Sequence, residues 1–349
     1  MKRRRKTRIL FVGNIPVGGR NPIAVQSMTK TDTEDVIATV EQITSLEASG
    51  CDIIRLAVPE IHAARSLGKI KKAIRIPMIA DIHFDWRLAL EAVRQGVDGL
   101  RINPGNIGAL WKTKEVVKAA CDKGLPIRIG VNAGSLEKDL LRKYGHPSPE
   151  ALVESAVNHI GILEKLKFTD IKVSLKASDV GKTVEAYRLF SKKYDYPLHI
   201  GISEAGPPSQ GIIKSSVGLG ILLSEGIGDT IRVSLTAAPE EEVRVAYAIL
   251  GSLGIRKRGV DLISCPTCGR CRINLRELVG KVEKKTKKID KPMTIAVMGC
   301  VVNGPGEARE ADFGIAGGKG RGILFRKGRI IKRVKENELL DVLLKEIEK

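Results

Sequence analysis

Eight short apolar runs, each followed by a segment with helical periodicity, constrain the fold of this chain most. The runs begin at residues 23, 51, 77, 99, 126, 170, 197 and 230 and are rich in β-branched residues, as strands are. The intervening segments carry helix signals, such as Ser148 as an N-cap with Pro149 at the first helical position. Eight strand–helix units in about 230 residues predict an α/β fold, a (β/α)8 TIM-type barrel.

A doubly wound parallel sheet is the alternative. It requires a glycine-rich turn after the first strand, and the segment MTKTDTEDV, residues 28–36, contains no glycine. The earlier RILFVGNIPVGG, residues 8–19, predicts a hairpin that precedes the barrel. The opening MKRRRK predicts a short, solvated basic tail.

The pattern changes after Gly254, where the regular strand–helix alternation ends. Residues 273–287 predict an amphipathic helix, residues 293–300 a buried strand, and the segment from about residue 336 a closing helix. We therefore expect two domains: a substrate-binding barrel over residues 1–254 and a smaller α+β domain over residues 255–349.

Polar and basic residues occupy alternate positions along several predicted barrel strands. Because residues i and i+2 of a strand share one face, and the apolar set must face the helices, the basic set points into the barrel or its mouth. Buried like charges are costly unless compensated, and only Asp81 and Glu204 are acids near these strand ends. The missing counter-charge is expected to be a ligand such as a phosphate or diphosphate. The set comprises Arg101, Asn103, Arg128, Asn132, Lys172, Ser174, Lys176, His199, Arg232 and Ser234.

The net charge of +19 favours anionic partners. No apolar run approaches the length of a membrane span, and the run ILFV, residues 9–12, is too short for a signal peptide. We therefore expect a soluble cytoplasmic protein, in which clustered cysteines indicate metal or redox chemistry rather than disulfides.

Three of the six cysteines lie in CPTCGRC, residues 265–271, and a fourth, Cys300, follows a predicted strand. A zinc ribbon usually supplies two CxxC pairs, whereas here the second half of the site offers one cysteine and the domain contains no histidine. Thiolates also hold [4Fe–4S] clusters, so the spacing favours iron–sulfur over zinc without excluding zinc. Beside Cys265, Cys268 and Cys300, the fourth ligand is either Cys271 or a carboxylate such as Glu307.

Three segments together carry a resemblance to a known family: RNPIAVQSMT at residue 20, SCPTCGR at residue 264 and MGCVVNGPGEAREADFGIAGG at residue 298. The chain resembles the two-domain bacterial 4-hydroxy-3-methylbut-2-enyl diphosphate synthases of the non-mevalonate isoprenoid pathway from end to end. The resemblance implies reductive dehydroxylation and ring opening of 2-C-methyl-D-erythritol 2,4-cyclodiphosphate. Electrons would come from flavodoxin or ferredoxin through a [4Fe–4S] cluster, in a head-to-tail homodimer.

The resemblance also implies roles for individual residues. The cluster ligands would be Cys265, Cys268, Cys300 and Glu307, and Glu204 would protonate the departing hydroxyl. Cys271 does not belong to the family motif. The cyclodiphosphate would be held by Arg55, His83, Arg101, Arg128, Asn132, Lys176, Arg232 and Ser234.

Two other classes of function remain open at this stage. One is a sugar-phosphate lyase or aldolase barrel with a structural zinc, in which Lys172 or Lys176 forms a Schiff base. The other is a zinc-dependent nucleic-acid-binding protein. Against the latter, aromatic residues make up only 4% of the chain, which leaves few side chains to stack on bases. We therefore expect neither a nucleic-acid nor a membrane partner.

Overall fold

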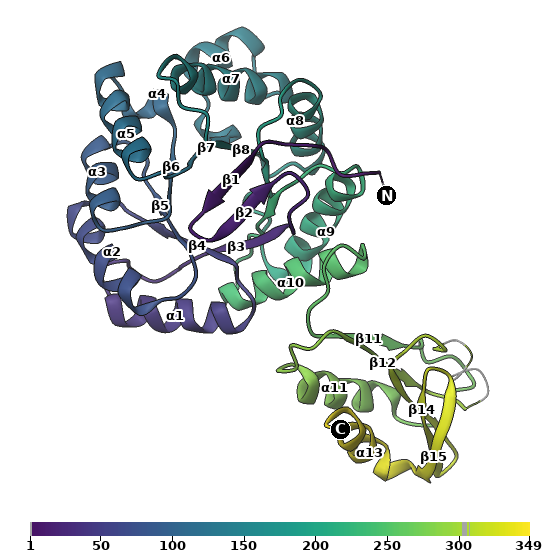
Figure 1. Ribbon diagram of the computed structural model, residues 1–349. Helices are drawn as coiled ribbons and strands as arrows, with labels where there is room; N and C mark the ends of the chain where they lie inside the picture. Colours follow the sequence, from purple (N-terminus) through teal and green to yellow (C-terminus); the bar gives the residue numbers. More distant parts are fainter. Residues whose placement is uncertain (1, 302–305, 307) are drawn as a thin grey trace. The chain divides into compact units, whose positions relative to one another are not determined.

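The computed structural model describes residues 2–301, 306 and 308–349. The chain divides into two compact units, Met1–Leu253 and Gly254–Lys349 (Figure 1). In the first unit, eight parallel strands follow one another in the order β8-β7-β6-β5-β4-β3-β10-β9. An isolated parallel bridge between Val173 of β8 and Leu198, just before β9, joins the two ends of this sheet. The predicted TIM-type barrel is confirmed.

Each barrel strand falls within one of the eight apolar runs. Their interiors are short and aliphatic, which suits parallel strands covered on their outer face by helices. The strands are β3 (Ala24–Met28), β4 (Ile53–Ala57), β5 (Met78–Asp81), β6 (Gly99–Ile102), β7 (Ile127–Asn132), β8 (Ile171–Lys176), β9 (His199–Ile200) and β10 (Thr230–Ile231).

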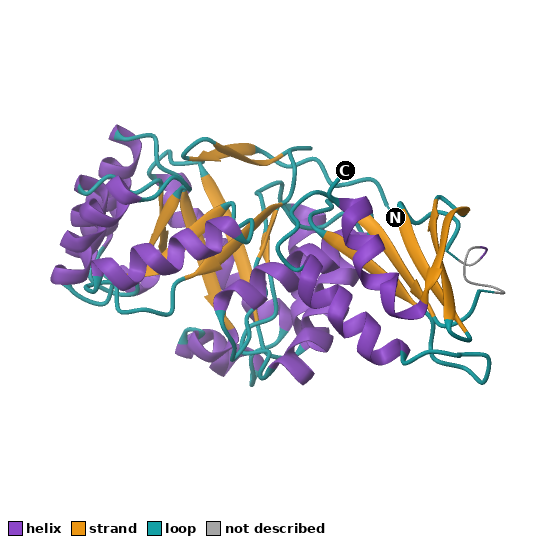
Figure 2. Ribbon diagram, turned by 90° about the horizontal axis from the view of Figure 1, so that it is seen from below, coloured by secondary structure: helices purple, strands orange, loops and turns teal. Residues whose placement is uncertain are grey.

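Helices surround the strands, as Figure 2 shows in purple around orange. Local signals fix several of their ends: Ser148 accepts a hydrogen bond from the Ala151 backbone N–H, with Pro149 at the first helical position. No helix in the described part of the chain is long and apolar enough to cross a membrane. The helices are α1 (Val36–Ala48), α2 (Ile61–Ala73), α3 (Trp86–Arg94), α4 (Pro104–Ile107), α5 (Leu110–Asp122), η1 (Ala133–Ser135), α6 (Lys138–Tyr144), α7 (Pro149–Lys165), α8 (Val180–Lys193), α9 (Pro208–Ser224) and α10 (Pro239–Ser252).

The predicted hairpin forms from β1 (Ile9–Val12) and β2 (Ile15–Gly18), which pair antiparallel. It lies across one end of the barrel (Figures 1 and 2). A Cβ at Gly13 would lie 3.0 Å from Pro77, which precedes β5, so this is the end where the strands begin. The hairpin packs with Ala24, Ile53 and Ile79 of the barrel strands. The opposite end, where strands finish, is therefore the end left for a site.

The segment before the hairpin is not the solvated tail that its charge predicts. The Arg5 backbone N–H donates to the Gly226 carbonyl at 3.0 Å, and the Arg5 side chain donates to the Tyr196 carbonyl at 2.7 Å. Arg4 forms an ion pair with Asp229 at 2.9 Å. The basic run supplies donors to carbonyls and a carboxylate of the barrel, which a sequence cannot reveal because the partners lie far along the chain. Three basic side chains do stay exposed: Lys2, Arg3 and Lys6.

The second unit contains a five-stranded sheet in the order β11-β12-β13-β14-β15. The first three strands are parallel and the last two pairs antiparallel. Helices α11 (Leu275–Thr286) and α13 (Leu339–Ile347) share one apolar cluster with residues from one face of this sheet, and a second cluster forms on the other face. The strands are β11 (Val260–Ser264), β12 (Met293–Met298), β13 (Phe313–Gly318), β14 (Arg321–Arg326) and β15 (Arg329–Lys335), and a short η2 (Glu336–Glu338) precedes α13.

Candidate active site

A cavity of about 210 Å³ lies inside the barrel toward the carboxyl ends of its strands. Five of its lining side chains are cationic, and only one is a carboxylate. Seven of the eight residues predicted to hold a diphosphate line it. The lining residues are Arg55, Asp81, His83, Arg101, Arg128, Asn132, Ser174, Lys176, Ser203 and Arg232.

Asp81, the last residue of β5, is the carboxylate that organises this group. It is 4% exposed and lies 3.5 Å from Arg55 Nε, 3.2 Å from Arg101 Nη1 and 3.7 Å from His83 Nε2. Burial opposes ionisation of Asp81, but attraction to Arg55, Arg101, Arg128 and His83 outweighs it and lowers the pKa of Asp81 to about 2. One negative charge is thus shared among several cations, which leaves the cavity with a positive excess.

Arg101 is held in place by its neighbours on β7. Its Nη2 donates to the Gly130 carbonyl at 2.9 Å, and the Gly130 backbone N–H donates to Asn103 Oδ1 at 3.0 Å. A Cβ at Gly130 would lie 2.5 Å from Arg101 Nε. Glycine is therefore required here so that the guanidinium can lie flat against the strand.

Several buried donors in this region lack a hydrogen-bond acceptor among the described residues: Arg101 Nε, Arg128 Nε, Lys172 Nζ and Arg232 Nε. Arg128 is 2% exposed. Burial, followed by repulsion from Arg55 and Arg101, lowers the pKa of Arg128 well below its usual value. Because a guanidinium stays protonated, this environment is unfavourable unless an anion enters.

A chain of polar contacts continues from Lys176 into the barrel. Lys176 Nζ lies 3.3 Å from His199 Nε2, and His199 Nδ1 lies 2.8 Å from Thr230 Oγ1. Burial, then repulsion from Lys176, lowers the pKa of His199 well below its usual value, so the imidazole is neutral. Burial, then repulsion from Arg128, also lowers the pKa of Lys176 well below its usual value. With Nδ1–H donating to Thr230, Nε2 is free to accept from an N–H of the Lys176 amino group.

Lys172 lies deeper, with 1% of its surface exposed. Burial, then repulsion from Arg128, lowers the pKa of Lys172 to about 7. A lysine of that pKa can form a Schiff base, but Lys172 is not among the residues that line the cavity. Its position offers no support for an aldolase.

Glu242, on α10, is a second buried acid that the sequence argument missed. It is 2% exposed, and its oxygens lie 3.0 Å from Lys30 Nζ and 3.8 Å from Arg232 Nη2. It also accepts the Leu235 backbone N–H at 2.9 Å. Glu242 belongs to a run of three glutamates in the first turn of α10, and such a run is also common at a solvated helix start.

Glu204 lies beside the cavity rather than in its lining. It is exposed, has a left-handed backbone with φ of +51°, and lines an adjoining cavity of about 300 Å³. The two cavities share Asn132, Lys176 and Ser203, so a ligand spanning them would meet both the cations and the Glu204 carboxyl. Ser234 lines neither of these two cavities.

The cysteines of the second unit follow the ends of two neighbouring parallel strands. Ser264, the last residue of β11, pairs with Val297 of β12. Cys265 and Cys300 therefore both follow the carboxyl ends of parallel strands, at the same end of the sheet. The Gly299 backbone N–H donates to Cys265 Sγ at 3.3 Å. All four thiols of this unit are free, and Cys268 is exposed.

Cys271 lies close to these strand ends but is engaged with the backbone. Its Sγ lies 3.4 Å from the Ile273 carbonyl, and a Cβ at Gly299 would lie 2.5 Å from that Sγ. The thiol therefore packs against Gly299, between the two strand ends.

The four free thiols of this unit, which contains no histidine, fit an iron–sulfur cluster by donor chemistry, and a cluster would use three of them with one further ligand or all four. The N–H group aimed at Cys265 Sγ suits a thiolate. Among the described residues no group of three potential ligand side chains stands together as a metal site. Glu307 lies outside the described residues.

Comparison with known proteins decides the family. Residues 7–247 match the model of the GcpE TIM-barrel domain, and residues 261–349 match that of the GcpE protein C-terminal domain. The chain belongs to the GcpE family. Its members include the 4-hydroxy-3-methylbut-2-en-1-yl diphosphate synthase (flavodoxin) of Thermodesulfovibrio yellowstonii, which is 64% identical over 349 residues and covers 100% of both chains. The protein of the same name from Geobacter sulfurreducens is 61% identical over 344 residues, 99% of this chain and 98% of its own.

Solved structures resemble the GcpE barrel at much lower identity. The Yersinia pestis dihydropteroate synthase superposes with a TM-score of 0.52 at 12% identity, over 70% of this chain and 98% of its own. A Stenotrophomonas maltophilia dihydropteroate synthase gives a TM-score of 0.51 at 13% identity, over 70% and 98% of the two chains. At such identities the likeness concerns the fold alone.

Proposed function

We propose that this chain converts 2-C-methyl-D-erythritol 2,4-cyclodiphosphate to (E)-4-hydroxy-3-methylbut-2-enyl diphosphate. The observation that carries the proposal is the barrel cavity, in which five cationic side chains face one carboxylate, in a chain whose full-length relatives bear the name of that synthase. A cyclic diphosphate supplies the missing negative charge.

The reaction takes up two electrons and one proton per dianionic substrate, breaks one C–O bond to open the ring, and releases a second oxygen as water. The product carries one more negative charge than the substrate, because ring opening frees a phosphate oxygen. The excess positive charge of the barrel cavity stabilises the negative charge that forms on the freed phosphate oxygen.

The barrel residues have distinct parts in this proposal. The guanidinium groups of Arg55, Arg101, Arg128 and Arg232 bind the diphosphate oxygens, since a planar fork matches them. Lys176 reaches the same cavity, the neutral His199 orients its amino group, and a bound diphosphate offsets the repulsion from Arg128 that lowers the pKa of Lys176. His83 and Asn132 line the same cavity and are proposed to contact the substrate as well. Ser234, two residues after Arg232, is the last proposed contact.

Glu204 is the proposed proton donor to the departing hydroxyl. It lies in the cavity that adjoins the cation-lined one, so its carboxyl is within reach of a substrate that extends from the diphosphate toward the strand ends.

Cys265, Cys268 and Cys300 are the proposed thiolate ligands of a [4Fe–4S] cluster, and Glu307 is the proposed oxygen ligand. When bound, such a cluster supplies electrons one at a time. Flavodoxin, which the names of the relatives include, is the proposed donor. A head-to-tail homodimer, in which one chain's cluster domain serves the partner's barrel, is the arrangement we propose for bringing cluster and substrate together.

The test is anaerobic purification followed by turnover. We expect brown protein that contains iron and sulfide and forms the diphosphate product from the cyclodiphosphate with reduced methyl viologen. Colourless protein that contains zinc and no sulfide would overturn the proposal.

The role of Glu204 is tested separately with Glu204→Gln, using Glu185→Gln on the outer side of α8 as the matched control. We expect Glu204→Gln to keep its iron and substrate affinity and to lose about 10²-fold or more in kcat. Equal kcat values for the two variants would remove Glu204 from proton transfer.

A further inference from the structure

The positive charge of the chain is concentrated in its smaller unit. Residues 254–349 contain 23 lysines and arginines against 12 aspartates and glutamates, a net charge of +11 out of +19 for the whole chain. The proposed small-molecule substrate does not account for this excess, because the cations that would bind it lie in the barrel.

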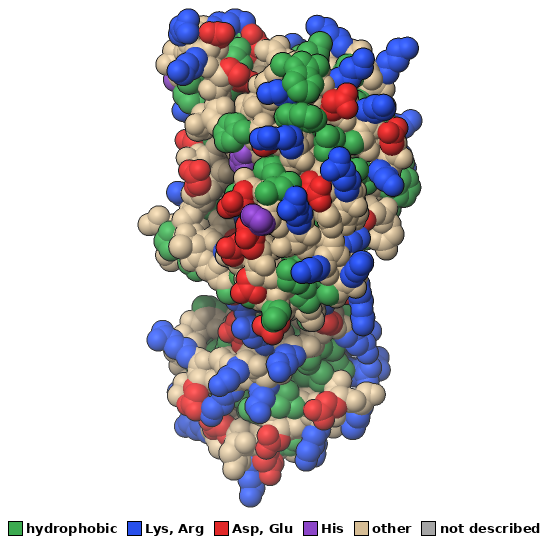
Figure 3. Space-filling model, turned by 90° about the vertical axis from the view of Figure 1, so that its left-hand side faces the viewer, with side chains coloured by type: hydrophobic (Ala, Val, Ile, Leu, Met, Phe, Trp, Pro, Cys, Tyr) green, Lys and Arg blue, Asp and Glu red, His purple; other side chains and the backbone are tan. Residues whose placement is uncertain are grey.

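Within this unit the excess is strongest on β13, β14 and β15. Residues 313–335 contain eight cations and no acid. All eight side chains are exposed, and seven of them form no ion pair within the described part of the chain; the eighth, Lys335, ends β15 and is the N-cap of η2. The eight are Lys319, Arg321, Arg326, Lys327, Arg329, Lys332, Arg333 and Lys335. The face of this unit that Figure 3 shows, in the lower part of the view, carries Lys and Arg side chains interspersed with Asp and Glu.

Apolar side chains accompany these cations. β15 is an edge strand, and Ile330 and Ile331 on it are 49% and 50% exposed. Protection of a sheet edge against pairing explains a lysine or two on β15, but it explains neither exposed isoleucines at the same edge nor Arg321 and Arg326 on the inner strand β14. Ile330 pairs with Phe325 and Arg333 with Ile323, so both share a face with Arg321, whereas Arg326 lies on the other face. On the face of Arg321 the cations accompany an exposed isoleucine, and this combination is typical of a site for another protein.

The strand register places one end of this surface near the cysteines. Met298 pairs with Ala316, so Cys300, two residues on, lies level with Gly318. Gly318 pairs with Arg321, and Arg321 pairs with Lys335. From the level of Cys300 to β15 is three strand spacings, roughly 14 Å. A protein bound to the β14–β15 hairpin would therefore lie close to the strand ends that carry the proposed cluster ligands, where electrons have to enter.

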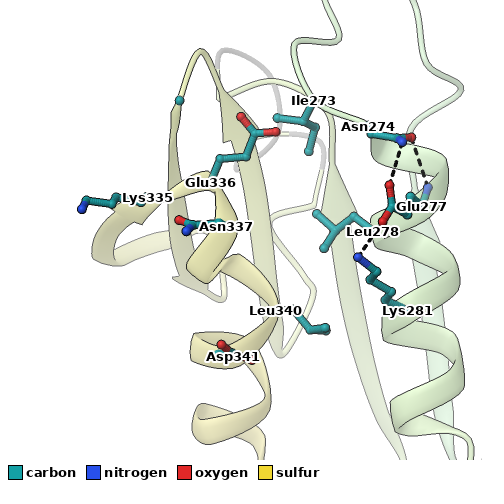
Figure 4. Close-up of a pocket in the computed structure, with 11 residues that line it drawn as sticks. Ile273, Asn274, Glu277, Leu278, Lys281, Lys335, Glu336, Asn337, Leu340 and Asp341 are labelled. Carbon is teal, nitrogen blue, oxygen red and sulfur yellow. Dashed lines mark hydrogen bonds and ion pairs between the residues drawn. The ribbon is translucent and has the colours of Figure 1, made fainter.

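Arg321 and Arg333 share one face of the sheet. Arg333 pairs with Ile323, two residues after Arg321, and Ile323 belongs to the apolar cluster on the face away from α11 and α13. The cavity on the helical side, about 530 Å³ between α11 and the start of α13, is lined by both signs of charge, including Glu277, Glu336 and Asp341. Lys335 also lines this cavity, and in Figure 4 the end of its side chain points outward from it.

We propose that the β14–β15 hairpin, Arg321–Lys335, is the docking surface for the electron-donor protein, and that this donor carries acidic residues around its redox group. The inference rests on the proposed function, and it says on which surface of the smaller unit the donor protein delivers electrons to the proposed cluster. Nucleic acid is a poorer occupant, because the one aromatic residue in 319–335, Phe325, is fully buried and bases would find nothing to stack on.

The test variant is Arg321→Glu combined with Arg333→Glu. The matched control is Lys284→Glu combined with Lys285→Glu, which makes the same change of charge at the last turn of α11. Helix α11 begins just after the cysteine segment and ends before the start of β12. Lys284 and Lys285 therefore lie at the end of the unit opposite the cysteines. Full-length holoenzymes are compared in two assays, one with reduced flavodoxin of negative net charge and one with reduced methyl viologen, which needs no docking surface.

We expect the hairpin variant to lose about tenfold or more in kcat/KM for flavodoxin at low salt, with a flatter salt dependence. The loss should shrink near 1 M salt, where the Debye length is about 3 Å. Viologen-driven turnover and iron content should match the control. These last two readouts also show that the variant is folded.

Three outcomes would overturn the docking surface. One is equal flavodoxin kcat/KM in hairpin and control variants. Another is a loss with viologen as large as the loss with flavodoxin. The third is a change of oligomeric state in the hairpin variant alone, which would make the hairpin a contact between copies of this chain. Failure of the proposed function has a different signature: wild-type protein would then turn over no cyclodiphosphate with either donor.

Discussion

Replacing Asp81 by asparagine tests whether one carboxylate holds the cation cluster of the barrel together. Asp81 lies within 3.7 Å of Arg55, Arg101 and His83 and is 4% exposed. Its pKa falls from an ordinary 3.8 to about 2, and at about 1.36 kcal/mol per unit this corresponds to roughly 2.5 kcal/mol of stability.

The sign follows from the direction of the shift. Because the pKa of Asp81 is depressed in the folded state, its contribution is fully present above pH 3.8 and is lost as the pH falls toward 2. Asparagine removes the contribution at every pH and leaves buried guanidinium groups uncompensated, which typically costs about 3–5 kcal/mol. For a unit of this size, a loss of about 2.5 kcal/mol lowers the Tm by roughly 5–10 °C.

The assay is thermal unfolding of the full chain at neutral pH, followed by fluorescence, with and without inorganic pyrophosphate. The control is Asp139→Asn, since Asp139 is exposed and its ion pair with Arg142 lies on the surface. We expect a Tm at least about 5 °C below that of the control, and a larger rise on adding pyrophosphate, because the anion replaces the lost negative charge. A Tm equal to that of the control would refute the argument that Asp81 compensates the arginines.

Four further substitutions, in three experiments, test other parts of the two units. Gly130→Ala should displace Arg101, whose Nε lies 2.5 Å from the new Cβ position, and steady-state kinetics should show KM for the cyclodiphosphate raised about tenfold with kcat little changed; an unchanged KM contradicts this. Iron analysis should show that Cys265→Ser loses the cluster while Cys271→Ser keeps it, and the reverse result would exchange their roles. Lys172→Met should remove a pH dependence of stability: the pKa of Lys172 is lowered from 10.5 to about 7, so the unfolded state binds more protons between these values and stability rises with pH there. Urea unfolding between pH 7 and pH 9.5 should show a slope smaller by up to about 1.4 kcal/mol per pH unit in the variant, and equal slopes would count against a neutral Lys172.

The barrel and most of its cation-lined cavity were predictable because both depend on local periodicity. Apolar runs of strand length locate the eight strands, and the two-residue repeat of a strand assigns Arg101 and Arg128 to the inside. No pairing between distant residues had to be known, since parallel strands joined by helices follow the chain order around a barrel.

What the sequence did not reveal depends on contacts between distant segments. Arg4 pairs with Asp229, 225 residues away, and nothing local distinguishes it from a solvated arginine. Glu242 did carry a local signal, because Val245, Ala246 and Ile249 fall on the same buried helical face. An acid on such a face indicates a buried partner, here Arg232 and Lys30.

The two groups of cations differ in burial, and burial determines how salt acts on them. Arg128 in the barrel is 2% exposed, so its contact with a bound diphosphate is direct and buried, and salt screens a buried pair much less than an exposed one. The hairpin cations, such as Arg333, are exposed and attract a partner through solvent, where screening is strong. One salt titration therefore separates the two partners: KM for the cyclodiphosphate should stay nearly constant while KM for flavodoxin rises steeply. If both constants rose in parallel, the positive charge of the chain would act as a single diffuse field, and the assignment of the barrel to the small anion and of the hairpin to the donor protein would lose its physical basis.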